Sequence, residues 1–236
     1  MNILIVNGSG SIGSSIVEGL NKSDVNLIIT SSTGEDVHGN KTMQWKYSGS
    51  ESVNVLFNSI KDKYNRLDSV VNCLGSIFIK PAHLTSEDDF DNTLNMNLKS
   101  SFLILKNTIP LMRKNGGNLL FFSSAAANIG MVNHEAIAAA KGGLEAMVKS
   151  AAATYAKNNI KINAIAPGLV ESNLSKNIIS NPMALEVSKK MHSVGRIGVP
   201  EDISKFAIPL IIDNSMWITG SIINIDGGLS TTKIAS

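Results

Sequence analysis

The feature that most constrains this chain is a regular alternation of short apolar runs with longer amphipathic segments. Seven of the runs have the length and composition of β-strands. They cover residues 2–6, 26–30, 42–45, 69–74, 118–123, 160–166 and 221–225. Because helical periodicity fills most of the intervals, the pattern indicates βαβ units. We therefore expect an α/β fold, in which a doubly wound parallel sheet of about seven strands carries helices on both faces.

Length and composition favour one domain. The 236 residues, 43% of them hydrophobic and 17% charged, are enough to bury a sizeable core and too few to require a second one. No linker or internal repeat divides the sequence. A single domain spanning residues 1–236 is expected.

The distribution of charge argues against nucleic-acid and membrane partners. The net charge of +2 comes from scattered Lys and Arg without a basic block, so a small-molecule substrate is favoured. The opening MNILIV is too short for a signal peptide, and the single Cys73 excludes an internal disulfide; both fit a reducing cytoplasm. The four histidines lie far apart in sequence, and none has Cys or His at metal-ligand spacing. We expect no metal site.

A long helix is expected between the fourth and fifth predicted strands. Thr85 and Asp88 have the spacing of a capping box, with further acidic residues in the first turn. The helical pattern continues to about Lys114, where the sequence NGGN ends it.

The first predicted strand leads into the glycine pattern Gly8-x-Gly10-x-x-Gly13, and a predicted helix follows at once. Gly8 permits a tight turn, Gly10 lets the backbone approach a pyrophosphate, and Gly13 allows close packing of helix on strand. Ser11 and Ile12 complete the loop. This order of elements indicates a Rossmann-type dinucleotide site, the alternative being a glycine-rich turn without a ligand.

The choice between NAD and NADP is only weakly encoded. The second predicted strand ends in IITSST, which has neither an acid for the ribose 2′-hydroxyl nor an Arg for a 2′-phosphate. Ser31 and Ser32 could hydrogen-bond a phosphate, which favours NADP over NAD.

Several ordered motifs resemble those of the short-chain dehydrogenase/reductase family. They are VVNCLG with Asn72 and Gly75, NMNLKSSF with Asn97, FFSSAA with Ser124, INAIAPGLVES with Pro167, Gly168 and Val170, RIGVPEDIS, and WITGSIINIDGG. The resemblance runs almost from end to end of the chain. It implies hydride transfer between a nicotinamide and a carbonyl or alcohol carbon, and a homo-oligomer, either dimer or tetramer.

The family resemblance also implies a catalytic tyrosine that this chain lacks. Family members place a Tyr four residues before a Lys whose charge lowers the phenol pKa. Lys141 matches that Lys, and Ser124 matches the Ser thirteen residues before the Tyr, which assigns the Tyr position to Ile137. Asn97 matches the family Asn that holds a water beside the Lys. A hydrocarbon side chain cannot donate a proton, so the expected site is incomplete.

His134 is the candidate replacement for the missing proton donor. It precedes Lys141 by seven residues, two helical turns on the same face, if the helix extends that far. The enoyl-thioester reductases of this family place their active Tyr at the same offset. Tyr155 is a poorer candidate, because fourteen residues of helix separate it from Lys141 by about 21 Å. The alternative is that His134 only caps or is solvated.

The remaining segments concern affinity, substrate and assembly. Lys46, Cys73 and Leu74 depart from the usual residues around the adenosine. Val170 would offer backbone groups to the nicotinamide carboxamide. Residues 172–194 stand where the family carries its substrate lid, and their apolar side chains either line a pocket or pack on the body. These side chains are Leu174, Ile178, Ile179, Met183, Leu185 and Met191.

Two functions follow from this sequence. The first is an NAD(P)-dependent oxidoreductase of short-chain type that acts on a carbonyl or an activated double bond with an altered proton donor. The second is a dinucleotide-binding sensor or partner subunit with little or no redox activity. His134 separates them, because only the enzyme needs a titratable group near Ser124 and Lys141.

Overall fold

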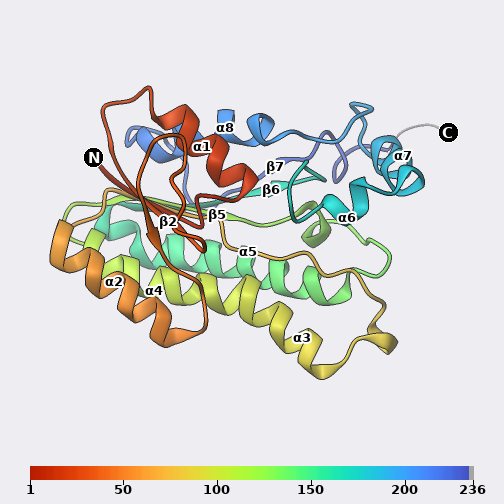
Figure 1. Ribbon diagram of the computed structural model, residues 1–236, viewed down its shortest axis with the longest axis horizontal. Helices are drawn as coiled ribbons and strands as arrows, with labels where there is room; N and C mark the ends of the chain where they lie inside the picture. Colours follow the sequence, from red (N-terminus) through yellow and green to blue (C-terminus); the bar gives the residue numbers. More distant parts are fainter. Residues whose placement is uncertain (234–236) are drawn as a thin grey trace.

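Seven parallel strands form one sheet in the computed structural model, which describes residues 1–233 (Figure 1). The strands are β1 Asn2–Val6, β2 Asn26–Ser31, β3 Thr42–Gln44, β4 Ser69–Asn72, β5 Gly117–Phe122, β6 Ile160–Pro167 and β7 Ile222–Ile225. Each lies on one of the predicted apolar runs. Their order is β3-β2-β1-β4-β5-β6-β7, and every neighbouring pair is parallel. The predicted Rossmann-type sheet is confirmed.

Helices cover both faces of the sheet. Helices α1 (Ser11–Leu20) and α8 (Pro200–Ile212) pack together on one face, and α2 (Ser50–Tyr64), α4 (Ser100–Met112) and α5 (Glu135–Tyr155) cover the other (Figure 1). The shorter elements are η1 Ala82–Leu84, α3 Glu87–Leu94, the π-helical η2 Asn95–Lys99, η3 Ala125–Ala127, η4 Ala156–Asn158, α6 Lys176–Ile179 and α7 Pro182–Met191.

The two faces of the sheet bury two separate cores, which explains why the strands are apolar throughout. In β1, Leu4 and Val6 point into the core with α2, α4 and α5, whereas Ile3 and Ile5 point into the core with α1 and α8. All four side chains are fully buried. A strand covered on both sides has no solvent face and therefore no polar alternation.

The helix predicted to have its N-cap at Thr85 has its N-cap one residue later, at Ser86. Ser86 is the N-cap residue of α3, and its Oγ accepts a hydrogen bond from the Asp89 amide at 3.1 Å. Thr85 instead closes the preceding η1 turn, since its amide donates to the Ala82 carbonyl and its hydroxyl to the Pro81 carbonyl. The capping box predicted for Thr85 and Asp88 is therefore wrong. The helical run then continues through η2 and α4 to Met112.

The connection from β2 to β3 contains no helix. Residues 32–41 form a loop in which the backbones of Val37 and Asn40 exchange two hydrogen bonds of 3.0 and 2.9 Å. Val37 is buried against the α1 and α8 core. The loop thus covers a part of the sheet where a doubly wound fold usually places a crossover helix.

Candidate active site and dinucleotide site

The predicted site residues gather at the carboxyl ends of the strands. The glycine loop follows β1, Asn72 ends β4, Ser124 follows β5, and Pro167 ends β6. The direction of strand order reverses between β1 and β4, because β2 lies on one side of β1 and β4 on the other. Open α/β sheets bind ligands in the crevice at such a reversal.

Gly8 and Gly13 are required by the packing of the protein, independently of any ligand. A Cβ on Gly8 would lie 2.6 Å from Ile29 Cγ2, and a Cβ on Gly13 would lie 2.9 Å from Gly8 Cα. The second contact is the close approach of α1 to β1 that the sequence predicted.

Gly10 has a different environment from the other two loop glycines. A Cβ on Gly10 would meet only atoms of Asn7, at 3.5 and 3.6 Å, and its φ of −67° suits any residue. Folding alone therefore does not require a glycine at this position. The backbone of Gly10 caps the N-terminus of α1, where free amides and the helix dipole favour an anion. A half-buried glycine with open space beside its Cα fits a backbone that a pyrophosphate approaches.

Ser31 and Asn72 use their side chains to hold the loops that follow their strands. Ser31 is buried, and its Oγ accepts hydrogen bonds from the amides of Thr33 and Gly34, each at 3.3 Å. Asn72 accepts from the Leu74 amide and donates to Ser101 Oγ in α4. Both residues lie at the expected edge and shape it through these hydrogen bonds.

Lys141 and Asn97 converge on one point above Gly75. A Cβ on Gly75 would lie 3.3 Å from Asn97 Oδ1 and 3.5 Å from Lys141 Nζ. Asn97 is fully buried in the π-helical η2 segment, and its amide group bonds the amide and hydroxyl of Ser76. A π-helical turn inside a longer helix is frequent at functional sites. Asn97 Oδ1 and Lys141 Nζ thus lie close together in the fold.

The side-chain amine of Lys141 is buried in the protein interior. Its side chain is 6% exposed, and Nζ donates a 2.8 Å hydrogen bond to the carbonyl of Phe122 at the end of β5. Burial lowers the pKa of Lys141 to about 8, because the low-dielectric interior disfavours the charged form. The amine therefore becomes easier to deprotonate than an exposed lysine.

Ser124 lies two residues beyond the carbonyl that Lys141 binds. Its side chain is half-buried, and Oγ accepts a hydrogen bond from the Ala126 amide at 3.2 Å, which caps η3. Lys141 and Ser124 are thus attached to the same strand end.

Ile137 and His134 lie at the start of α5. Ile137 is 5% exposed and lies one helical turn before Lys141. His134 is the N-cap residue, and its Nδ1 is 2.7 Å from the Val132 carbonyl oxygen. Within residues 1–233, His134 forms no hydrogen bond with Ser124 or Lys141. His134 is half-buried.

The PGLV segment leaves β6 toward the lid region. The Gly168 amide donates to the Ile225 carbonyl, and the Val170 carbonyl accepts from Ser175 Oγ at 2.6 Å. A Cβ on Gly168 would lie 2.5 Å from His192 Nε2, so only glycine fits here. The local sequence around His192 does not indicate that its ring reaches back to this segment.

Glu145 is a second residue that sequence reasoning missed. It is 7% exposed, one helical turn after Lys141, and its Oε1 accepts hydrogen bonds from Ser123 Oγ at 2.6 Å and Asn128 Nδ2 at 3.1 Å. The sequence feature that could have indicated Glu145 is a carboxylate within a helical run of small and apolar residues. It braces the strand end that carries Ser124.

The comparisons with known proteins agree with this geometry. A family model described as enoyl-(acyl carrier protein) reductase matches residues 6–230. The 3-oxoacyl-[acyl-carrier-protein] reductase FabG of Thermotoga maritima is 31% identical over 180 residues, 76% of this chain and 72% of that protein. The chain belongs to the short-chain dehydrogenase/reductase family.

Other relatives within the short-chain dehydrogenase/reductase family extend the comparison. An uncharacterized oxidoreductase of Thermotoga maritima is 35% identical over 172 residues, covering 71% of this chain and 68% of that one. Solved structures of ElxO, one of a tyrosine-to-phenylalanine variant with NADPH and one with NADP, superpose with a TM-score of 0.88 at 27% identity, covering 98% of this chain and 99% of theirs. The seven-stranded architecture is therefore that of the family.

Metal binding and membrane insertion would each require a further structural feature. Within residues 1–233, no group of three or more His, Cys, Asp or Glu side chains could hold a metal ion. No helix in the same range is long and apolar enough to span a membrane.

Proposed function

We propose that this protein is an NAD(P)-dependent oxidoreductase of short-chain type that reduces or forms a carbonyl, or reduces an activated double bond, with an altered proton donor. The convergence of Lys141 and Asn97 beside the strand end that carries Ser124 is the observation that supports it best. A buried lysine is costly, and such groups concentrate at functional sites.

The cofactor in this proposal is NADP(H), with NAD(H) as the alternative. The residues that would hold it are the loop from Gly8 to Gly13, Ser31, Asn72, Gly75, Lys141, Pro167, Gly168 and Val170. The fit of Gly10 to an approaching anion and the NADP and NADPH in the ElxO structures support the choice. Bound at this edge, the nicotinamide would supply or accept the hydride.

Each protein group has a distinct role in the proposed reaction. The Ser124 hydroxyl would donate a hydrogen bond to the substrate oxygen and polarise it. The Lys141 ammonium would bind the nicotinamide ribose, and Asn97 would hold the segment around Gly75. His134 Nε2 would deliver the proton to the reduced product, provided that α5 and its preceding loop bring the ring to the substrate.

A second candidate function rests on Ile137. A buried hydrocarbon at the family's Tyr position favours a dinucleotide-binding sensor or partner subunit with little redox activity. General acid catalysis contributes about 10²- to 10⁴-fold in rate, so its loss without replacement would leave a binder.

The first test is binding at the glycine loop. Gly10→Val is expected to weaken NADPH binding at least about tenfold, because the new side chain would occupy the space of the pyrophosphate while the fold accommodates its Cβ. Calorimetric titration measures the affinity. Gly130→Val is the matched control, since a Cβ there meets no atom within 4 Å. Unchanged affinity in the Gly10 variant would show that the loop is only a turn.

The lid remains part of the proposal. Residues 172–194 carry α6 and α7 at the end of the molecule beyond the sheet (Figure 1). Of their apolar side chains, Leu174 and Met183 are 56% and 79% exposed, whereas Ile178, Ile179 and Leu185 are half-buried. The exposed side chains are available to close over an apolar substrate.

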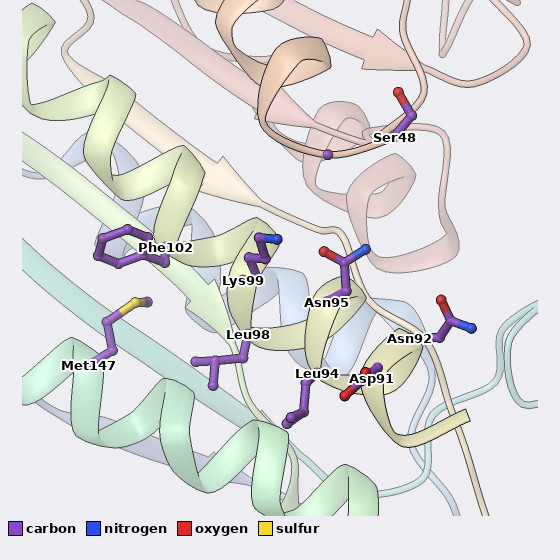
Figure 2. A pocket seen from close by; sticks show the side chains of 10 residues that line it. Ser48, Asp91, Asn92, Leu94, Asn95, Leu98, Lys99, Phe102 and Met147 are labelled. Atoms are coloured by element: carbon purple, nitrogen blue, oxygen red, sulfur yellow. The ribbon is translucent and has the colours of Figure 1, made fainter. Parts of the chain in front are cut away.

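The face of α4 and α5 is proposed to bind a second copy of the chain, giving a homodimer or homotetramer. A pocket with a volume of about 840 Å³ lies there. Figure 2 shows Leu98, Phe102 and Met147 on one side of it, and polar residues such as Asp91 and Asn95 also line it. Phe102 is 52% exposed, and none of the residues that line the pocket belongs to the proposed active site.

The cytoplasm is the proposed location of the protein.

Assembly through this face predicts the effect of a charge. Phe102→Glu is expected to lower the assembly state, because the interface would have to bury a carboxylate beside Leu98 and Met147. Light scattering after size exclusion measures the mass. Phe206→Glu on α8 is the matched control for a similarly exposed phenylalanine on the other face of the sheet. A mass that does not change in the Phe102 variant would contradict this interface.

A further inference from the structure

The ring of His192 lies in a narrow slot between two chain segments far from it in sequence. The side chain is 3% exposed at the end of α7. Two glycines flank it: a Cβ on Gly168, after β6, would lie 2.5 Å from Nε2, and a Cβ on Gly227, after β7, would lie 3.5 Å from Cδ2. A Cβ at Gly168 would therefore displace the ring, whereas a Cβ at Gly227 would be in ordinary van der Waals contact with it.

The two hydrogen bonds of the ring define its protonation state. The backbone amide of Leu169 can only donate, so Nε2, at 3.1 Å, must accept and carry no proton. The Ser188 carbonyl can only accept, so Nδ1, at 2.6 Å, must carry the proton. The geometry therefore requires the neutral imidazole, with its hydrogen on Nδ1.

These two bonds join the lid to the segment proposed to bind the nicotinamide. Ser188 belongs to α7, and Leu169 directly precedes Val170. Leu169 and Val170 are held in turn by Gly198, which donates to the Leu169 carbonyl and pairs with Val170 in a β-bridge. Loss of the hydrogen bonds of the His192 ring would thus alter the position of the lid and of the PGLV segment together.

We propose that His192 is a positioning residue that couples the 172–194 lid to the Leu169–Val170 backbone, and that only its neutral form maintains the coupling. A proton on Nε2 would set two donors, the ring and the Leu169 amide, against each other in a buried place. Acidification would then release the backbone that presents Val170. The identity of the ligand affected rests on the proposed function.

The charged groups around the ring have other partners. From β7's end, Asp226 accepts from the Gly228 and Ser230 amides. Arg196 and Asp202 line the same small cavity and form an ion pair with each other. On α7 itself, Lys189 pairs with Glu186, and Lys190 is exposed. Among the described residues, none of these charged side chains forms a hydrogen bond with the imidazole.

The test compares a glutamine and a leucine at this position. His192→Gln keeps an amide oxygen that can accept from Leu169 and does not titrate, whereas His192→Leu removes the acceptor. Binding of NADP⁺ is measured by calorimetry at pH 8.0 and pH 6.0. We expect wild-type affinity to fall about two- to fourfold more than that of the Gln variant on acidification, and the Leu variant to be weaker at both values. Titration of the ligand's own phosphate cancels in this comparison.

A second measurement needs no cofactor and no variant. The protection of the Leu169 amide against hydrogen exchange, corrected for the intrinsic rate at each pH, is expected to drop about two- to fourfold from pH 8.0 to pH 6.0 in the wild type. A drop without any NADP⁺ binding would support the coupling and reject the proposed function. Equal protection at both values, or the same pH dependence of binding in wild type and Gln variant, would overturn the inference about His192.

Discussion

Replacing Ile137 by tyrosine is expected to raise the rate of NADPH-dependent reduction of activated ketones by roughly 10- to 100-fold. The substitution places a phenol one helical turn before Lys141, whose charge would lower the phenol pKa. The gain should fall below the full general-acid factor, because Ile137 is 5% exposed and its surroundings are packed around a smaller side chain. Initial rates of NADPH oxidation measure it.

The matched control is Ile137→Phe, which adds the same ring without the hydroxyl. A difference between the Tyr and Phe variants isolates the phenol from any effect of overpacking. If both variants bind NADPH and neither gains activity, the assignment of Ser124, Ile137 and Lys141 to one site is wrong.

His134→Ala, tested beside the two Ile137 variants, divides the proposed functions. Any native activity should fall at least about tenfold if His134 donates the proton, since that is the lower part of a general acid's contribution. Activity that does not change would mean that His134 is not the donor and only occupies the N-cap position of α5, with its ring bound to the Val132 carbonyl.

Replacing Lys141 by methionine is expected to raise the free energy of unfolding at pH 7 by about 2 kcal/mol in the absence of cofactor. The pKa of Lys141 is lowered from 10.5 to about 8 by burial, so the charged amine in the folded protein costs about 3 kcal/mol. The lost hydrogen bond to the Phe122 carbonyl offsets about 1 kcal/mol of the gain. Urea denaturation measures the difference.

The sign of the pH dependence follows from the direction of the shift. Between about pH 8 and 10.5, the unfolded chain keeps the Lys141 proton and the folded chain has lost it. The stability of the wild type should therefore rise with pH relative to the Met variant, and the gap should shrink by about 2 kcal/mol from pH 8 to pH 10.

Cys73 produces the opposite trend but does not affect this comparison. Burial raises the pKa of its thiol to about 12, so stability falls as the pH rises above 9 in both proteins, and the contribution cancels. A gap between wild type and Met variant that is constant with pH would contradict a buried amine. A higher stability together with weaker NADPH binding in the Met variant would indicate that Lys141 is kept for function at a cost in stability.

The sequence alone determined the strands and the glycine loop, because these depend on neighbours along the chain. All seven predicted runs contain a strand, since an apolar run bounded by turns has few other ways to be buried. Gly13 shows the close approach to Gly8 that the motif predicts. Ser124 and Lys141 lie near the same strand end, with η3 and a short loop between β5 and α5.

Only the tertiary structure decided how residues distant in sequence meet. The start of α3 moved to Ser86 because Thr85 closes the turn before it. The convergence of Asn97 and Lys141 above Gly75 joins three elements, and the bond from Leu169 to His192 joins β6's end to α7. Such contacts depend on strand order and on the packing of whole helices. Periodicity reports only which face of an element is buried, and it does not report which polar group that face will meet.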